Sequence, residues 1–144
     1  MEKHITLEEL GSIAHDLLER ARMAKSSTAT LITLSGDLGA GKTTLTQQIA
    51  DTLGVRETVI SPTFVIMKSY KTTDNDFKNL VHIDAYRLNH SKELLNLGWE
   101  KMLADKENLI IVEWPERVPE CVIGKTCHVE LLHIDENTRG IVFK

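Results

Sequence analysis

Apolar residues near the start of the chain recur at the spacing of an amphipathic helix. They share one helix face and are Leu7, Leu10, Ile13, Ala14, Leu17, Leu18 and Ala21. Just before them, Thr6 and Glu9 have the Thr-x-x-Glu spacing of a capping box, in which the two residues satisfy each other's backbone N–H groups. The pattern therefore predicts a first helix over roughly residues 6 to 24.

A short apolar run follows, and the periodicity changes. Residues 29–34 read ATLITL, which is typical of a buried strand, and residues 36–43 read GDLGAGKT. Helical spacing returns over residues 42–53, with Gly54 as a natural stop. The predicted order is strand, glycine-rich loop and helix.

Downstream, short β-branched or aliphatic runs predict strands. They lie at residues 64–70, 80–83, 109–114, 128–134 and 140–143. Between the second and third runs, residues 91–105 have leucines and a methionine at helical spacing, interrupted by Gly98. One broken helix or two short helices would fit this segment.

Residues 36–43 match G-x-x-x-x-G-K-[ST] at every fixed position, which predicts a phosphate-binding loop (P-loop). Glycines let consecutive backbone N–H groups converge on a phosphate, and the N-terminus of the following helix favours anions. We expect Lys42 to reach the β- and γ-phosphates of a nucleotide and Thr43 to bind Mg²⁺. The predicted nucleotide-binding residues of this segment are Asp37, Leu38, Gly39, Ala40, Gly41, Lys42, Thr43 and Thr44. The alternative is a glycine-rich turn that binds no ligand.

These elements predict an α/β fold with a P-loop NTPase-type sheet flanked by helices. The late strands are joined by brief connections, so the sheet is expected to be mixed, with an antiparallel portion at one end. No internal repeat or low-complexity segment interrupts the chain. We therefore expect residues 1–144 to form a single domain.

Two acidic residues close predicted strands: Asp84 follows LVHI and Glu113 follows LIIV. Ligands of open α/β sheets bind beyond the carboxyl ends of the strands, where the P-loop also emerges. We expect both acids to hold Mg²⁺ or its waters opposite Thr43, although a lone acid at a strand end is also a common turn-capping residue. His82 lies two residues before Asp84 on the same side of the strand and could order that carboxylate. A hydrogen-bonded core histidine is the alternative.

Two further segments are candidates for the site: a loop after the predicted P-loop helix, and a tryptophan at the end of the strand predicted at residues 109–114. The loop at residues 61–64 reads SPTF, and the Thr63 hydroxyl is placed to complete a metal shell, as in a switch loop. The alternative is a turn and the start of a strand. Trp114 offers an aromatic face to a base or a partner, but tryptophan is also an ordinary core residue.

Composition narrows the function classes. The chain has 17 Lys and Arg against 21 Asp and Glu, so it has no overall basic charge for binding nucleic acid, and any tRNA contact is expected to come through a partner. No stretch of 18 apolar residues and no apolar signal core occur, which predicts a cytoplasmic location without a membrane span. Cys121 and Cys127 fit neither zinc spacing nor a disulfide framework and are expected to be reduced thiols.

Four motifs together resemble the bacterial TsaE (YjeE) family of small ATPases in tRNA threonylcarbamoyladenosine (t6A) biosynthesis. They are GDLGAGKTT at 36–44, SPTF at 61–64, HIDAYRL at 82–88 and VEWPER at 112–117. The resemblance also extends to the predicted N-terminal helix and to the TRGIVF segment near the end of the chain. The order and spacing of all four make the resemblance far more specific than a P-loop alone.

The resemblance implies roles for individual residues. Lys42 and Thr43 would bind phosphate and Mg²⁺, Glu113 would be a metal ligand, and Asp84 would be essential to hydrolysis near the metal. Lys42, Asp84 and Glu113 thus form the expected catalytic set. Thr63 would belong to a switch-like loop. The resemblance also implies that Tyr86, Arg87 and Trp114 lie near the nucleotide or partner face, and that Thr6 and Arg139 lie near the adenine.

The family implies an ATPase that uses ATP and Mg²⁺ together with a TsaD-like transferase and its TsaB-like paralogue, which would hold the tRNA. A small-molecule kinase is one alternative, but it should have an arginine-rich lid, and the arginines after the P-loop are scattered. A GTPase should show N-K-x-D, which does not occur. A nucleotide-gated binding module with negligible hydrolysis remains the third possibility.

Overall fold

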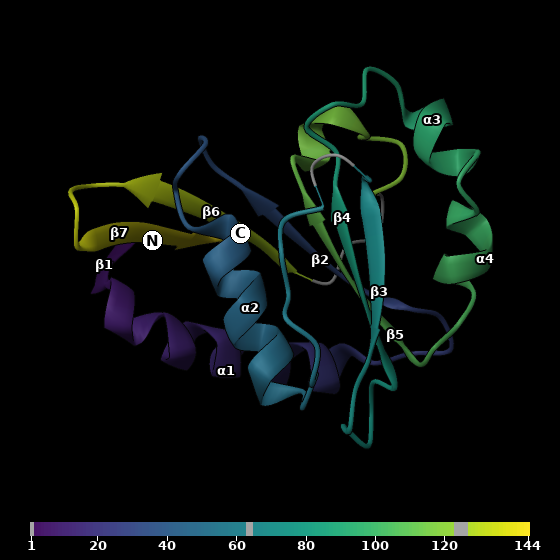
Figure 1. Cartoon of the computed structure of the whole chain (residues 1–144), viewed down its shortest axis with the longest axis horizontal. Helices are drawn as coiled ribbons and strands as arrows, with labels where there is room; N and C mark the ends of the chain where they lie inside the picture. Colours follow the sequence, from purple (N-terminus) through teal and green to yellow (C-terminus); the bar gives the residue numbers. More distant parts are fainter. Residues whose placement is uncertain (1, 63–64, 123–126) are drawn as a thin grey trace.

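The computed structural model describes residues 2–62, 65–122 and 127–144, and these form a seven-stranded mixed sheet flanked by helices (Figure 1). The order of strands across the sheet is β1-β7-β6-β2-β5-β4-β3. Their bounds are β1 Glu2–Thr6, β2 Thr30–Ser35, β3 Met67–Lys71, β4 Asn79–Asp84, β5 Asn108–Glu113, β6 Cys127–His133 and β7 Thr138–Phe143. The predicted α/β fold with an antiparallel portion is confirmed.

Helices cover both faces of the sheet. The α-helices are α1 Leu10–Ala24, α2 Lys42–Thr52, α3 Ser91–Leu95 and α4 Trp99–Leu103, and the 3-10 helices are η1 Leu7–Glu9 and η2 Pro115–Arg117. Figure 1 shows α1 and α2 together on one side, and α3 and α4 at the other end of the molecule. None of the helices in the described ranges is long and apolar enough to cross a membrane.

The middle of the sheet is parallel, which brings the carboxyl ends of four strands to one edge. β2 pairs in parallel with both β5 and β6, and β5 pairs in parallel with β4. In this register, Leu34 of β2 lies opposite Glu113 of β5, which lies opposite Asp84 of β4. The P-loop therefore leaves β2 beside the two strand-end acids.

The sheet separates two hydrophobic cores. On one face, Ile32 and Leu34 of β2 and Ile111 of β5 belong to the core that contains α1 and α2. On the other face, Leu31 and Ile110 belong to the core that contains α3, α4 and the η2 region. Parallel strands covered on both faces read as continuous apolar runs, which explains why β2 and β5 were predicted from sequence.

The start of the chain differs from the prediction. Thr6, expected at the start of the first helix, is instead the last residue of β1, and the α-helix begins only at Leu10 after the turn of η1. β1 is an exposed edge strand with only Ile5 buried, so it carries no apolar alternation that would reveal it. Its antiparallel pairing with β7 is made by the backbone. The expected Thr6–Glu9 contact is present at this junction.

The strand expected at residues 64–70 also begins later, because β3 starts at Met67. Ile66 has a φ of +71°, a left-handed conformation that an extended strand does not contain. Phe64 lies outside the described residues. The segment at 91–105 forms two short helices, with Gly98 at φ +90° between them, so the second of the two expected arrangements is the one observed.

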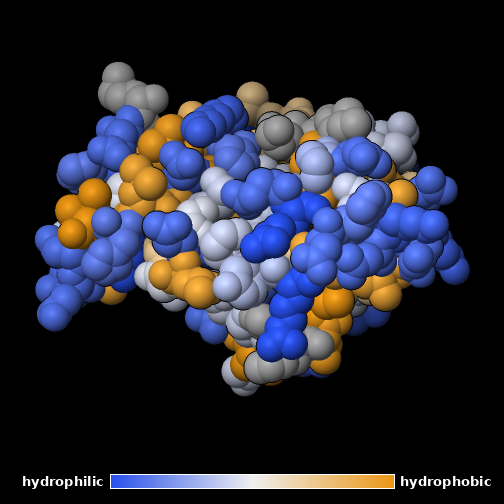
Figure 2. Space-filling model, turned by 90° about the horizontal axis from the view of Figure 1, so that it is seen from above, coloured by the Kyte–Doolittle hydropathy of each residue, from blue (hydrophilic) through white to orange (hydrophobic). Residues whose placement is uncertain are grey.

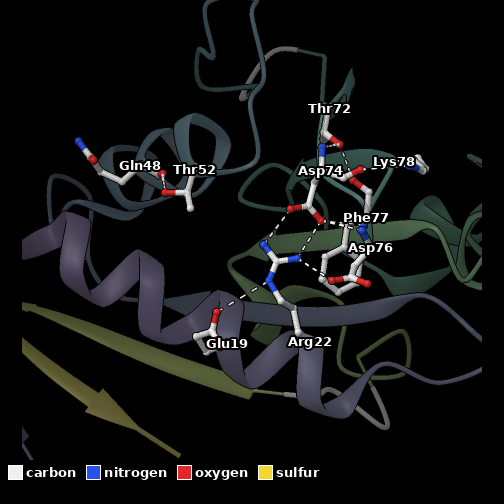
Figure 3. A network of polar contacts seen from close by, with 9 residues as sticks. All are labelled: Glu19, Arg22, Gln48, Thr52, Thr72, Asp74, Asp76, Phe77 and Lys78. Carbon is white, nitrogen blue, oxygen red and sulfur yellow. Dashed lines mark hydrogen bonds and ion pairs between the residues drawn. The ribbon is translucent and has the colours of Figure 1, made fainter.

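An ion-pair network fastens the connection between β3 and β4 to the end of α1 (Figure 3). The Arg22 guanidinium donates to both oxygens of Asp74 at 2.8 Å and to Asp76 at 2.9 Å. Asp74 also accepts the backbone N–H groups of Asp76 and Phe77. Chiefly because of the hydrogen bond from Arg22, the pKa of Asp74 falls from 3.8 to about 2. The turn over the buried Phe77 ring is thereby held against α1.

Candidate functional site: a P-loop beside two strand-end carboxylates

The P-loop, residues 36–43, connects β2 to α2 with a backbone that only glycine permits. β2 is buried along its whole length, so the loop starts from a fixed point in the core. Gly39 and Gly41 have φ values of +81° and +104°, which side chains with a Cβ rarely adopt. A Cβ at Gly36 would lie 2.3 Å from the carbonyl oxygen of Leu131. The compact loop therefore depends on its glycines.

Lys42 is the first residue of α2, and its ammonium group lies within the P-loop. Nζ donates to the carbonyl oxygens of Gly36 and Asp37 at 2.5 and 2.9 Å. It lies 4.5 Å from the centroid of the Trp114 ring. Burial lowers the pKa of Lys42, and the negative charge of Glu113 opposes that change. This places a buried amine at a helix N-terminus, where anionic phosphates bind.

The two strand-end acids lie opposite each other and have different partners. Asp84 and Glu113 are paired in register and are only 4% and 3% exposed. Thr43 Oγ1 donates to Glu113 Oε2 at 3.4 Å. Asp84 accepts from Ser61 Oγ at 3.5 Å and from the backbone N–H of Tyr86 at 3.0 Å. The structure thus brings together the hydroxyl and the two carboxylates that the sequence singled out.

The Thr43 hydroxyl and the carboxylates of Asp84 and Glu113 are suitable ligands for Mg²⁺. All three are oxygen ligands, which is the chemistry that this ion prefers, and all three side chains line one cavity. Within the described ranges, no group of three or more His, Cys, Asp or Glu side chains could hold a metal ion by itself. Mg²⁺ in nucleotide sites does not need such a group, because it keeps several waters and is also held by substrate phosphates. The residues therefore suit a metal bound together with a nucleotide.

The cavity has a volume of about 320 Å³ and lies at the edge of the sheet where the P-loop emerges. It is lined by Leu7, Leu38, Gly39, Gly41, Lys42, Thr43, Thr44, Ser61, Asp84, Glu113, Trp114 and Arg139. Figure 2 views the molecule from above, the side to which the turn between β2 and α2 rises in Figure 1. Pale and hydrophilic residues occupy the middle of this face, and hydrophobic groups lie toward its sides.

Three predicted site residues do not line the cavity. Thr6 is engaged elsewhere, because its backbone N–H and Oγ1 both donate to Glu9 Oε1. Asp37 and Ala40 belong to the loop but take part through their carbonyl oxygens, which accept from Lys42 and Arg139. Thr63, the predicted switch residue, lies outside the described residues.

Sequence reasoning missed two residues that line the cavity. Leu7 was assigned to the apolar face of a helix, and nothing in its type or spacing signals a ligand contact. Ser61 belongs to the SPTF motif, but the pattern of a switch loop predicts Thr63 as the functional hydroxyl. Its position three residues before the strand predicted at 64–70 was the available signal, because that loop was already expected near the site.

Arg139 reaches the P-loop from β7, although it is far away in sequence. Its Nε donates to the carbonyl oxygen of Ala40 at 3.2 Å. Its Nη1 donates to the carbonyl oxygens of Asp135 and Thr138 at 2.6 and 2.9 Å. The guanidinium, which lines the cavity, is thus fixed by backbone oxygens of the P-loop and of residues 135 and 138.

Trp114 turns the chain sharply after Glu113. Its φ of +60° is uncommon for a bulky residue, and its backbone N–H donates to the carbonyl oxygen of Leu34 at 3.2 Å. The ring lies 4.9 Å from the Tyr86 ring, centroid to centroid, and Arg117 lies 5.7 Å from the Tyr86 centroid. The HIDAYRL and VEWPER motifs therefore form one aromatic and basic wall next to Lys42.

Of the two interpretations of His82, a hydrogen-bonded core histidine is the one observed. Its ring is fully buried, and its Nε2 makes a hydrogen bond with Oε2 of Glu113 on the neighbouring strand. Position along one strand identified the face of His82 correctly but gave no information about the adjacent strand. Cys121 and Cys127 are both free thiols, as expected, and burial raises the pKa of each.

The chain is similar in sequence to a family of known proteins. The family model "Threonylcarbamoyl adenosine biosynthesis protein TsaE" matches residues 5–141. TsaE of Rickettsia felis is 37% identical over 110 residues, which cover 76% of this chain and 61% of that protein. TsaE of Streptomyces coelicolor is 48% identical over 87 residues, covering 60% of this chain and 57% of that protein. The matched segment thus spans less than two thirds of either relative.

A further relative and a solved structure extend the comparison. TsaE of Bacillus subtilis is 34% identical over 113 residues, covering 78% of this chain and 68% of that protein. The crystal structure of Bacillus subtilis YdiB superposes with a TM-score of 0.71 at 27% identity, covering 99% of this chain and 83% of that one. From the extent of the family match and the agreement of fold, the chain belongs to the TsaE family.

Proposed function

We propose that this protein binds and hydrolyses Mg²⁺–ATP in support of a TsaD–TsaB-like complex that forms t6A on tRNA. The observation that carries the proposal is the meeting of Lys42, Thr43 and two buried strand-end carboxylates in one cavity beside a P-loop. Phosphoryl transfer to water requires cationic groups on the phosphates, a metal site and a group that orients the water. Each requirement has a candidate residue here.

Different residues would bind the phosphates and the metal ion. Lys42 Nζ, which now donates to two loop carbonyls, would donate to phosphate oxygens, and the free N–H groups at the N-terminus of α2 would add to the same attraction. Thr43 and Glu113 would hold Mg²⁺ through their oxygen atoms. When bound, this ion would neutralise part of the negative charge on the phosphates.

Asp84 would act on the attacking water. Its carboxylate is buried, faces the cavity and is oriented by the backbone N–H of Tyr86 and by Ser61. A carboxylate fixed in this way can accept a hydrogen bond from water and take up its proton. Glu113 is assigned to the metal instead, because Thr43, the P-loop hydroxyl expected to bind Mg²⁺, donates to its Oε2.

The base of the nucleotide would lie at the other end of the cavity. Among the lining residues, Leu7 and Leu38 would give apolar contacts, and the fixed guanidinium of Arg139 would give a planar cation that can stack on an adenine. Trp114 sits close to Lys42 and so belongs to the phosphate end. These contacts favour a purine but include no arrangement that reads guanine in the way of an N-K-x-D motif.

The output of hydrolysis would be a change in protein contacts. The chain has a net charge of −4, so tRNA would be held by the partners and not by this protein. Ser61 joins the segment before β3 to Asp84, and Ile60 before it and Val65 four residues after it are 63% and 66% exposed. A nucleotide that moves Asp84 or Ser61 would therefore alter an exposed apolar surface beside the site.

Two measurements test this function. Phosphate release from ATP should be slow for the protein alone and faster with a TsaD–TsaB-like complex, and association should be stronger in ATP than in ADP or without nucleotide. Ser61→Ala should weaken the difference between ATP and ADP. Equal association in all conditions would reject nucleotide gating. ATP-dependent association without phosphate release would indicate a binding module, and a phosphorylated small molecule would indicate a kinase.

A further inference from the structure

His82 is a wholly buried polar residue on the face of the sheet that bears the cavity. Two of its neighbours on this face are apolar, because Leu80 lies two residues earlier on β4 and Ile111 lies directly opposite on β5, whereas the exposed Lys68 lies opposite on β3 and Asp84 lies two residues later on β4. The hydrogen bond from its ring goes to Glu113, which lies diagonally across on β5. Diagonal positions on neighbouring strands are within reach of long side chains.

The hydrogen bond with Glu113 determines which nitrogen of the His82 ring carries the hydrogen. An ionised carboxylate can only accept hydrogen bonds, so Nε2 of His82 carries the hydrogen and donates it to Glu113. The other nitrogen, Nδ1, is buried and has no hydrogen-bond partner within the described parts of the chain. A buried nitrogen without a partner costs free energy, which an apolar side chain at this position would not. The contact with Glu113 is therefore what the imidazole contributes.

We propose that His82 is a positioning residue that orients the Glu113 carboxylate for Mg²⁺, an inference that rests on the proposed function. The alternative partner of this carboxylate is Lys42, whose amine is close enough to be influenced by its charge. A direct Lys42–Glu113 ion pair would occupy both the cation needed by the phosphates and the oxygen needed by the metal. Donation from His82 holds Glu113 Oε2 on the side of Thr43 and keeps the two groups available.

The test compares two substitutions that differ in one hydrogen bond. His82→Leu removes the hydrogen-bond donor and fills the buried space of the ring with an apolar side chain. His82→Gln retains a side-chain N–H at about the same distance from the backbone. Mn²⁺ serves as the probe, with binding to the protein–ATP complex measured by electron paramagnetic resonance. ATP affinity in EDTA is measured in parallel, because it reports on the fold of the P-loop without the metal.

His82→Leu is expected to weaken Mn²⁺ binding by about tenfold, the size of effect typical of lost outer-shell hydrogen bonds, while its ATP affinity in EDTA stays within about twofold of wild type. His82→Gln should recover most of the loss. Ile83→Val is the matched control, because Ile83 lies in the same strand but belongs to the core on the opposite face. It should behave as wild type in both titrations.

The outcomes separate this inference from the proposed function. If wild type binds Mn²⁺ with ATP and His82→Leu binds it equally well, the positioning role is wrong and the function stands. If His82→Gln is as impaired as His82→Leu, the hydrogen bond is not the cause and the inference fails. If wild-type protein shows no metal-dependent binding of ATP, both proposals fail.

If His82→Leu does not fold, the proposal can still be tested by a measurement on the His82 side chain in the folded protein. Nitrogen NMR of the histidine side chains should show an Nε2–H signal for His82 that shifts in Glu113→Gln, because the acceptor changes from a carboxylate to an amide. It should stay constant in Ile83→Val. An Nδ1–H tautomer, or a signal unaffected by Glu113→Gln, would overturn the proposal.

Discussion

Asp84, the last residue of β4, lies directly opposite Glu113, the last residue of β5, in a parallel pair of strands. Two buried carboxylates this close repel each other, and a divalent cation between them would relieve the repulsion. Their hydrogen bonds nevertheless differ. Asp84 is oriented by a backbone N–H and a serine, whereas Glu113 is contacted by the P-loop threonine and by a histidine. Asp84 and Glu113 thus occupy equivalent positions in the sheet but have different hydrogen-bond partners.

This asymmetry predicts different effects of removing each charge. Asp84→Asn should keep Mg²⁺–ATP binding within about threefold and lower hydrolysis at least about a hundredfold, because an amide is a poor proton acceptor. Glu113→Gln should also weaken Mg²⁺-dependent binding by about tenfold, because a neutral oxygen replaces a charged ligand. Titrations with ATP and Mg²⁺ and single-turnover hydrolysis measure both effects. Wild-type turnover by Asp84→Asn would remove it from the mechanism.

A second prediction concerns the phosphate and metal contacts at the start of α2. Lys42→Ala should abolish productive ATP binding, because it removes the P-loop cation that we propose binds the phosphates. Thr43→Ala should mainly weaken the Mg²⁺-dependent part of binding, because it removes one neutral oxygen ligand. Calorimetric titration with ATP in Mg²⁺ and in EDTA distinguishes them. Unchanged affinity and unchanged metal dependence in both variants would contradict the P-loop assignment.

The parts of the fold that sequence predicted are those in which one physical signal dominates. β2 and β5 are buried on both faces and read as continuous apolar runs, and α1 shows its periodic apolar stripe. β1 could not be found in this way. Four of its five residues are exposed, and the strand exists because its backbone pairs with β7 at the other end of the chain.

The candidate site shows the same division. Lys42 and Thr43 are fixed by local loop geometry, and Asp84 and Glu113 by their position at strand ends, so sequence could indicate all four. The contact of His82 with Glu113 depends on which strands are neighbours and on their register. Arg139 reaches Ala40 across the sheet, and only the resemblance to a known family brought it into the prediction.

A third prediction uses two glycines of the P-loop that differ in their surroundings. Both Gly36 and Gly39 have a positive φ, but a Cβ at Gly36 would meet the Leu131 carbonyl oxygen at 2.3 Å, and one at Gly39 would meet nothing within 4 Å. Gly39→Ala should therefore cost only the conformational strain, about 1–2 kcal/mol of unfolding free energy. Gly36→Ala should cost more and should also lower ATP affinity. Equal losses in denaturant unfolding would show that β6 does not confine the loop.

The last prediction concerns Asp74, whose pKa of about 2 lies below its ordinary value of 3.8. A carboxyl group with a lowered pKa in the folded state contributes stability above its unfolded pKa and loses that contribution as the pH falls through its folded pKa. Asp74→Asn should therefore lower the unfolding free energy by about 1–2 kcal/mol near neutral pH, after allowance for partial exposure of the Arg22 pair. The difference from wild type should shrink as the pH falls from about 4 to about 2.

The control for this network is Glu19, which lies 3.9 Å from Arg22 with a side chain that is 58% exposed. Glu19→Gln should change the unfolding free energy by less than about 0.5 kcal/mol, because exposed ion pairs contribute little. Urea unfolding of wild type and both variants at several pH values measures the two effects. A loss in Asp74→Asn that persists unchanged at the lowest pH would mean that the charge on Asp74 does not hold the β3–β4 turn to α1. Convergence of wild type and Asp74→Asn in acid, as wild type loses the contribution of the ionised carboxylate, would assign that role to the Arg22–Asp74 pair.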